Sequence, residues 1–302
     1  MADLRIHHNT TYRYREPVTL LPHRLMLRPR ESPDLRIVRT TLSISPRATV
    51  TWANDVFSNA VATATFDARA DTLSIDSTVD LQLHAKSSPE YDVATTARNY
   101  PFLYAPDEWT DLGALTTPQY PDADGRLRDW AHGFIHSNPT GTLALLYDLS
   151  DGVACGIGYQ ARDVEGTQSP LETLDRGWGS CRDFAVLFAD AARTLGFGAR
   201  IASGYLYNPD PNCAGAIGCG STHAWAEVYV PGAGWITFDP TNRSVGGINL
   251  IPVAVARDIA QVVPVAGDFV GMTDAFIGLT VELSVTDRRP NSVQTTARQA
   301  RG

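Results

Sequence analysis

The chain has 302 residues, of which 43% are hydrophobic and 19% charged, a balance typical of a folded protein long enough for two domains. Its formal net charge of -8 excludes the proteins that bind nucleic acid through a strongly basic surface. No apolar run approaches the roughly 20 residues of a membrane-spanning helix, and the first residues lack the pattern of a cleaved secretion signal. We therefore expect a cytoplasmic protein that has neither a membrane nor a nucleic acid as a partner.

Residues 1–100 carry the pattern of an all-β domain. Apolar and polar residues alternate over 35–44 and 72–83, with threonine and valine enriched, which is typical of half-buried antiparallel strands. Several prolines interrupt the pattern and predict turns or strand edges. We expect an N-terminal antiparallel β-sandwich-like domain.

Residues 101–140 lose the alternation and are expected to form a connector with helical turns. Residues 141–287 are expected to form a second domain, in which 181–195 is the clearest helix of the chain because apolar residues recur at steps of three and four. Strands are expected over 199–207, 224–230 and 234–238, with further strands up to 285, so the fold class is α+β. Residues 288–302 are polar without an apolar period, and we expect a loose tail.

The four cysteines are too few for a disulfide framework, and no two have the spacing of a zinc site. The acidic segment 122–125 is too short to predict a calcium site. We therefore expect neither a metal nor an organic cofactor. Cys213 and Cys219 stand six positions apart, and a disulfide between them is left open.

Cys181 is the residue with the strongest chemical signal. It opens the predicted helix, where the partial positive charge of the N-terminal amides favours thiolate over thiol, and Gly177 and Gly179 leave room for a substrate backbone. The alternative is a buried structural cysteine. His223 and Asp239 follow on two strands joined by a predicted turn at 231–234, and a hairpin would bring them side by side. Taken singly, His223 could be a packing residue, and Asp239 could form an Asx turn.

Four blocks of this sequence resemble the core of the transglutaminase-like superfamily: 179–183, 203–205, 223–228, and 234–235 with 238–241. Residues 10–14, 17–18 and 25–30 are similar to the β-rich N-terminal region of bacterial members. The resemblance implies a papain-like core in which Cys181 is the nucleophile, His223 the general base and acid, and Asp239 the orienting carboxylate. Trp178, which departs from the small or basic residue expected there, is a weaker candidate for the oxyanion or substrate pocket.

Two more aromatic residues, Tyr159 and Trp225, are candidates for the same pocket, and packing is the alternative for each. Arg182 and Asp183 are expected to cap the helix or to pair within the fold.

A thiolate that attacks an amide forms a thioester, and the next reactant decides the function. Water gives a peptidase or amidase, an amine gives a protein-glutamine gamma-glutamyltransferase, and a glycosylated asparagine as first substrate gives an N-glycanase-like hydrolase. The triad is the same in all three. We favour hydrolysis of a peptide or protein substrate, since bacterial relatives of this architecture are regarded as cysteine proteases. Amine transfer is the second hypothesis, and a non-catalytic binding or scaffold module is the third. The oligomeric state is left open.

Overall fold

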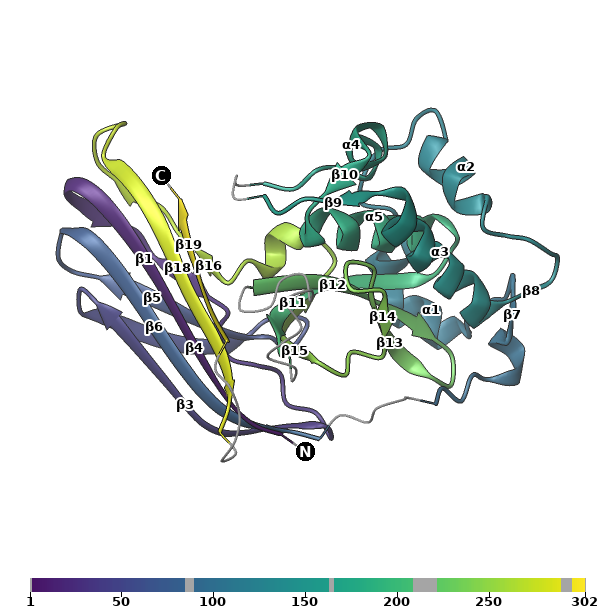
Figure 1. Ribbon diagram of the computed structural model, residues 1–302, viewed down its shortest axis with the longest axis horizontal. Coiled ribbons are helices and arrows are strands. Elements are labelled where there is room, and N and C mark those ends of the chain that lie inside the picture. Colours follow the sequence, from purple (N-terminus) through teal and green to yellow (C-terminus); the bar gives the residue numbers. More distant parts are fainter. Residues whose placement is uncertain (1, 85–89, 163–165, 209–221, 289–294, 302) are drawn as a thin grey trace.

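The computed structural model describes residues 2–84, 90–162, 166–208, 222–288 and 295–301, with side chains up to residue 288. Two lobes stand side by side (Figure 1): a β lobe made of the beginning and end of the chain, and a mixed lobe made of its middle. Within the described ranges, no helix has the length and apolar character needed to cross a membrane.

The β lobe contains two antiparallel sheets. One has the order β19-β18-β1-β6-β3, with β17 also paired to β1, and the other has the order β16-β2-β5-β4. The two sheets enclose a shared apolar cluster that includes Val18, Leu25 and Leu73. The strands are β1 (Ala2–Leu20), β2 (His23–Leu25), β3 (Leu35–Ser45), β4 (Ala48–Asn54), β5 (Ala60–Phe66), β6 (Ala70–Leu83), β16 (Val265–Ala266), β17 (Phe269–Val270), β18 (Phe276–Asp287) and β19 (Thr295–Arg301).

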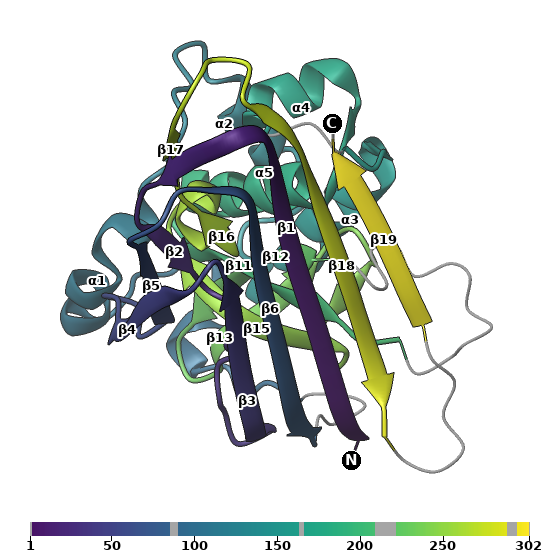
Figure 2. The same cartoon turned by 90° about the vertical axis from the view of Figure 1, so that its left-hand side faces the viewer.

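The last two strands differ from the sequence-based expectation. Residues up to 287 were expected in the second domain and 288–302 as a loose tail, but β18 pairs with β1 from Leu4↔Asp287 to Tyr14↔Phe276, and β19 pairs with β18. Figure 2 shows β18 between β1 and β19 in the sheet that faces the viewer. A period-two pattern predicts a strand without indicating which sheet it joins, and here the partner lies more than two hundred residues away in sequence.

The segment between the lobes also differs from a simple connector. It contains η1 (Thr95–Ala97), β7 (Asn99–Tyr100), α1 (Pro106–Leu112), η2 (Gly113–Thr116), α2 (Arg126–His132) and β8 (Thr140–Gly141). Leu127 and Ala131 on α2 are fully buried in the same cluster as the central helix. Much of the predicted connector is therefore part of the mixed lobe.

In the mixed lobe one buried helix packs on an antiparallel sheet of the order β14-β13-β12-β11-β15. The helix is α5 (Cys181–Thr194), and its contacts are mainly with β12 and β11. The predicted α+β class is confirmed. The remaining elements are α3 (Thr142–Gly156), β9 (Gly158–Tyr159), α4 (Pro170–Arg176), β10 (Trp178–Gly179), β11 (Gly198–Leu206), β12 (Thr222–Val230), β13 (Gly234–Asp239), β14 (Ser244–Val245), β15 (Leu250–Ala256) and η3 (Ile259–Val262).

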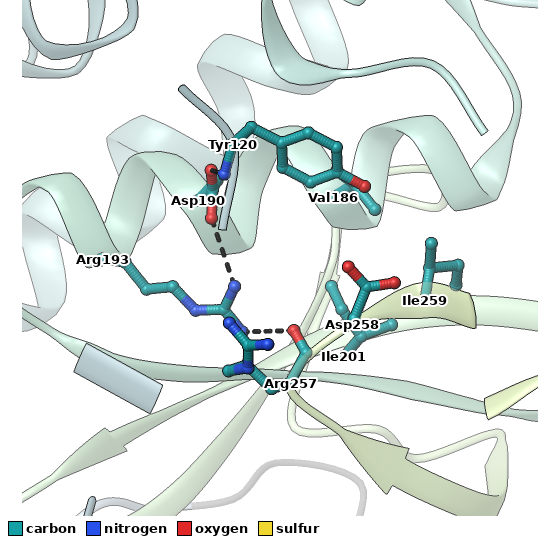
Figure 3. A pocket seen from close by; sticks show the side chains of 8 residues that line it. All are labelled: Tyr120, Val186, Asp190, Arg193, Ile201, Arg257, Asp258 and Ile259. Atoms are coloured by element: carbon teal, nitrogen blue, oxygen red, sulfur yellow. Dashed lines mark hydrogen bonds and ion pairs between the residues drawn. The ribbon is translucent and has the colours of Figure 1, made fainter. Parts of the chain in front are cut away.

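A buried ion pair fixes the C-terminal half of α5. Arg193 bonds Asp190 at 3.2 Å and also donates to the carbonyl oxygens of Ala199 and Arg257. Figure 3 shows the small pocket that this pair lines together with Tyr120. Asp190 lies nine residues beyond the start of the helix, which is about 14 Å along its axis. Because both charged groups are bonded within the fold, the pair braces the helix rather than forming part of the cysteine site.

The two lobes are joined by polar contacts as well as by a common apolar core. The side chain of Asn59 is fully buried and bonds both the amide and the carbonyl of Val255 on β15, at 2.9 and 2.7 Å. His8 on β1 contacts the hydroxyl of Tyr205 on β11 at 3.0 Å. The sheet that carries His223 is thus held by the β lobe.

Candidate active site

The start of α5 is fixed by a fully buried carboxylate. Asp183 Oδ2 accepts hydrogen bonds from the amide and the hydroxyl of Ser180, both at 2.8 Å, while Oδ1 accepts from the amide of Gln168 and from Arg162. The bond from the Ser180 amide to the side chain three residues on is one half of a capping box, and it satisfies a donor at the start of the helix. Cys181 lies in the first turn between them, so its backbone is held on both sides.

His223 lies at the start of β12 and Asp239 at the end of β13, and the two strands form the predicted hairpin. Imidazole Nε2 contacts Asp239 Oδ2 at 2.8 Å, and both side chains are 0% exposed. Since Nε2 faces a carboxylate, it carries a proton. Nδ1 is buried and has no hydrogen-bond partner of regular geometry among the described residues. It is therefore the nitrogen that remains to interact with the thiol.

The electrostatics of Cys181 and His223 are coupled. Burial opposes the thiolate, but the hydrogen bond and charge of His223, the amide of Ala224 and the charge of Arg182 outweigh burial and lower the pKa of Cys181. Burial likewise opposes the imidazolium, yet Asp239 and then Cys181 raise the pKa of His223 to about 10. The arrangement therefore favours a thiolate beside an imidazolium at neutral pH, the state in which a cysteine is nucleophilic.

Asp239 is held by four donors. Its Oδ2 accepts from His223 and from Asn242 Nδ2, each at 2.8 Å, and its Oδ1 accepts from the amides of Thr241 and Asn242 at 3.1 and 3.4 Å. The aspartate forms the Asx-type turn that its sequence allows and also contacts the histidine, so the two interpretations coexist. Asn242 was not predicted as a site residue; the only sequence signal for it is its place three positions after Asp239 in that turn.

The three weaker candidates have different surroundings. Tyr159 is half-buried, packs edge-on against Phe184 and pairs with Gly179, two residues before Cys181. Burial, followed by the charge of Cys181, raises the pKa of Tyr159 to about 12. Trp178 is half-buried, with the guanidinium of Arg176 5.6 Å from its ring centre.

Trp225 is not a pocket residue. It is 1% exposed and packs in an apolar cluster with Ala202 and Leu206, while its ring centre lies 6.0 Å from that of His223. The alternative that it braces the strand therefore holds. Period two places Trp225 and His223 on one side of the strand, but it does not indicate that this side is covered by the β lobe.

Of the other cysteines, Cys155 is exposed and free. Cys213 and Cys219 lie outside the described residues, so a disulfide between them stays an open question. In the part of the chain that the structure describes, no group of three or more His, Cys, Asp or Glu side chains is arranged to hold a metal ion.

Comparison with known proteins defines the class. Residues 4–82 match the bacterial transglutaminase-like N-terminal region, and residues 128–240 match the transglutaminase-like superfamily. An uncharacterized protein of Mycobacterium tuberculosis is 31% identical over 279 residues, which cover 87% of this chain and 86% of that protein. An uncharacterized protein of Mycobacterium leprae is 25% identical over 295 residues, covering 94% and 99%. The chain belongs to the transglutaminase-like superfamily.

A solved structure from Cytophaga hutchinsonii, described as a "Putative Cysteine Protease", is similar over nearly the whole chain. The TM-score is 0.71 at 19% identity, and the match covers 99% of this chain and 98% of the other. The likeness shows that the two proteins share the fold over nearly their whole lengths.

Proposed function

We propose that the protein is a cysteine-dependent hydrolase of amide or peptide bonds that acts through a thioester acyl-enzyme. The observation that carries the proposal is the buried contact of His223 Nε2 with Asp239 Oδ2 beside a half-buried Cys181 whose pKa is lowered. A residue with only a packing role needs none of these features. The combination supports a catalytic cysteine over a scaffold module.

The steps follow from the proton positions. The Cys181 sulfur attacks the carbonyl carbon, and the imidazolium gives its proton to the leaving amine as the C–N bond breaks. The thioester remains, and His223 takes a proton from water, whose oxygen attacks the thioester carbon. The C–S bond then breaks and the thiolate returns. Asp239 keeps its charge throughout and fixes the tautomer with the proton on Nε2.

Hydrolysis is favoured over amine transfer by one comparison only, the cysteine protease description of the Cytophaga protein, which supports it at the level of the fold. The same triad would serve for hydrolysis by water, for transfer to an amine and for hydrolysis of a glycosylated asparagine. Transfer to an amine is therefore the second candidate function. Cytoplasmic location stays a prediction.

One experiment separates the candidates. The protein is incubated with casein, with a glutamine-containing acceptor plus a fluorescent primary amine, and with an asparagine-linked glycopeptide, and the products are read by mass spectrometry. Hydrolysis predicts new peptide ends, transfer predicts amine incorporation, and a glycanase predicts conversion of asparagine to aspartate. Cys181→Ala should abolish the product, whereas Cys155→Ala, which removes an exposed thiol, should not. No product in any arm, with the native protein folded, would contradict the proposal.

A further inference from the structure

Asn242 makes two kinds of contact at the site. Its side-chain nitrogen donates to Asp239 Oδ2 at 2.8 Å and lies 3.4 Å from His223 Nε2. Its backbone amide approaches the other carboxylate oxygen at 3.4 Å. The same residue therefore bonds both oxygens of the carboxylate that faces the histidine.

The 3.4 Å approach between the two nitrogens is not a hydrogen bond in the state just described. Nε2 carries a proton because it faces Oδ2, and an amide nitrogen is a donor only. Two donors thus converge on one oxygen. Removing the side-chain amide would leave Oδ2 with the imidazole alone, so the carboxylate would be held only by His223 and by the two backbone amides at Oδ1.

We propose that Asn242 is a positioning residue that acts through Asp239: it keeps Oδ2 in line with the Nε2–H of His223, so that the imidazolium persists beside the thiolate. The inference rests on the proposed function, because it assigns a role within the same site. Asn242 has no part in bond making or breaking.

The β lobe supplies a matched control. His7 Nε2 contacts Asp76 Oδ2 at 2.7 Å, and Asn9 Nδ2 donates to the same oxygen at 3.1 Å. This trio has the same composition and convergence of donors but lies on the exposed face of the long sheet, with the histidine and aspartate side chains 42% and 39% exposed. Asn9→Ala removes the same chemical group far from Cys181.

The test is the rate at which iodoacetamide labels Cys181 as a function of pH, read by peptide mass spectrometry. In Asn242→Ala the lower limb of the profile should move to higher pH by about one unit, and kcat/KM for a substrate found in the assay above should fall about 10-fold. Asn9→Ala should change neither. An unchanged profile in folded Asn242→Ala would overturn the proposal.

A double-mutant cycle separates positioning from a general structural role. If Asn242 acts through the carboxylate, Asn242→Ala should change the labelling rate less than about 2-fold in an Asp239→Asn background. An equal loss in both backgrounds would mean that Asn242 acts independently, which contradicts the inference. Should Asn242→Ala fail to fold, Asn242→Ser keeps a short donor and should shift the profile in the same direction by less. Because labelling needs no substrate, the result stands apart from the search for turnover.

Discussion

Two clusters of the same composition occur in different lobes. Each consists of a histidine and an asparagine that both contact one oxygen of an aspartate, and the members are His7, Asp76 and Asn9 in the β lobe and His223, Asp239 and Asn242 in the mixed lobe. The histidine-to-carboxylate distances are nearly equal, at 2.7 and 2.8 Å. The first pair is 42% and 39% exposed and the second 0% and 0%.

The contacts within the trio therefore do not by themselves account for the proposed catalytic site. Water screens the charges of an exposed pair, so that such a pair contributes little. In the mixed lobe both side chains are fully buried, so the carboxylate acts on the imidazole at low dielectric. The same imidazole, through its hydrogen bond and charge, helps to lower the pKa of Cys181. Burial and the neighbouring thiol, rather than the trio itself, distinguish the second cluster.

The largest expected difference between the clusters is in activity. His223→Ala should lower kcat/KM by about 1000-fold, because the thiolate loses its counter-ion and the leaving amine its proton donor. His7→Ala should leave kcat/KM unchanged. The measurement is turnover of the substrate that the product assay reveals. Equal losses of kcat/KM in the two variants would contradict a catalytic role that is specific to His223.

The second expected difference between the clusters is in their contribution to stability. Asp239→Ala leaves a buried imidazole without its partner and frees two backbone amides, and the free energy of unfolding should fall by about 3 kcal/mol or more. Asp76→Ala removes an exposed partner and should cost less than about 1 kcal/mol. Denaturant titration of both variants checks this. A cost for Asp76→Ala as large as that for Asp239→Ala would show that burial is not the deciding factor.

His8 is a third histidine, and it is buried without a carboxylate partner. Burial, followed by the charge of His7, lowers its pKa to about 4, and its ring contacts the hydroxyls of Tyr205 and Thr10. The unfolded chain binds a proton below about pH 6.5 that the folded chain excludes until about pH 4, so stability should be lost as the pH falls through this window, by about 3 kcal/mol. His8→Gln should show a smaller loss over the same window. An identical slope in both proteins would refute the assignment.

The sequence predicted the parts of the site that depend on local signals. The period of α5, the turn at 231–234 and the cysteine at a helix start each lie within a few residues. The structure places Cys181 in the first turn of α5 and His223 in contact with Asp239. That the three act as a catalytic triad stays a prediction. The pairing of β18 with β1 was missed because it depends on contacts between residues that are far apart in the sequence. For Trp225 the sequence left a pocket role and a packing role open, because the surface that covers it comes from another lobe.

Asn242 was missed for a different reason. An Asx turn accounts for an asparagine three positions after an aspartate, so the sequence did not indicate a second role for Asn242. The role becomes visible only when the distance of 2.8 Å to Oδ2 and that oxygen's contact with His223 are known together.

The most direct measurement is the pH dependence of Cys181 labelling in the native protein and in His223→Ala, with exposed Cys155 in the same sample as reference. A thiolate stabilised by the imidazolium predicts that native Cys181 reacts at pH values well below those at which Cys155 does, and that His223→Ala abolishes this advantage. A native Cys181 that follows the profile of Cys155, or one that His223→Ala leaves unchanged, would contradict the account.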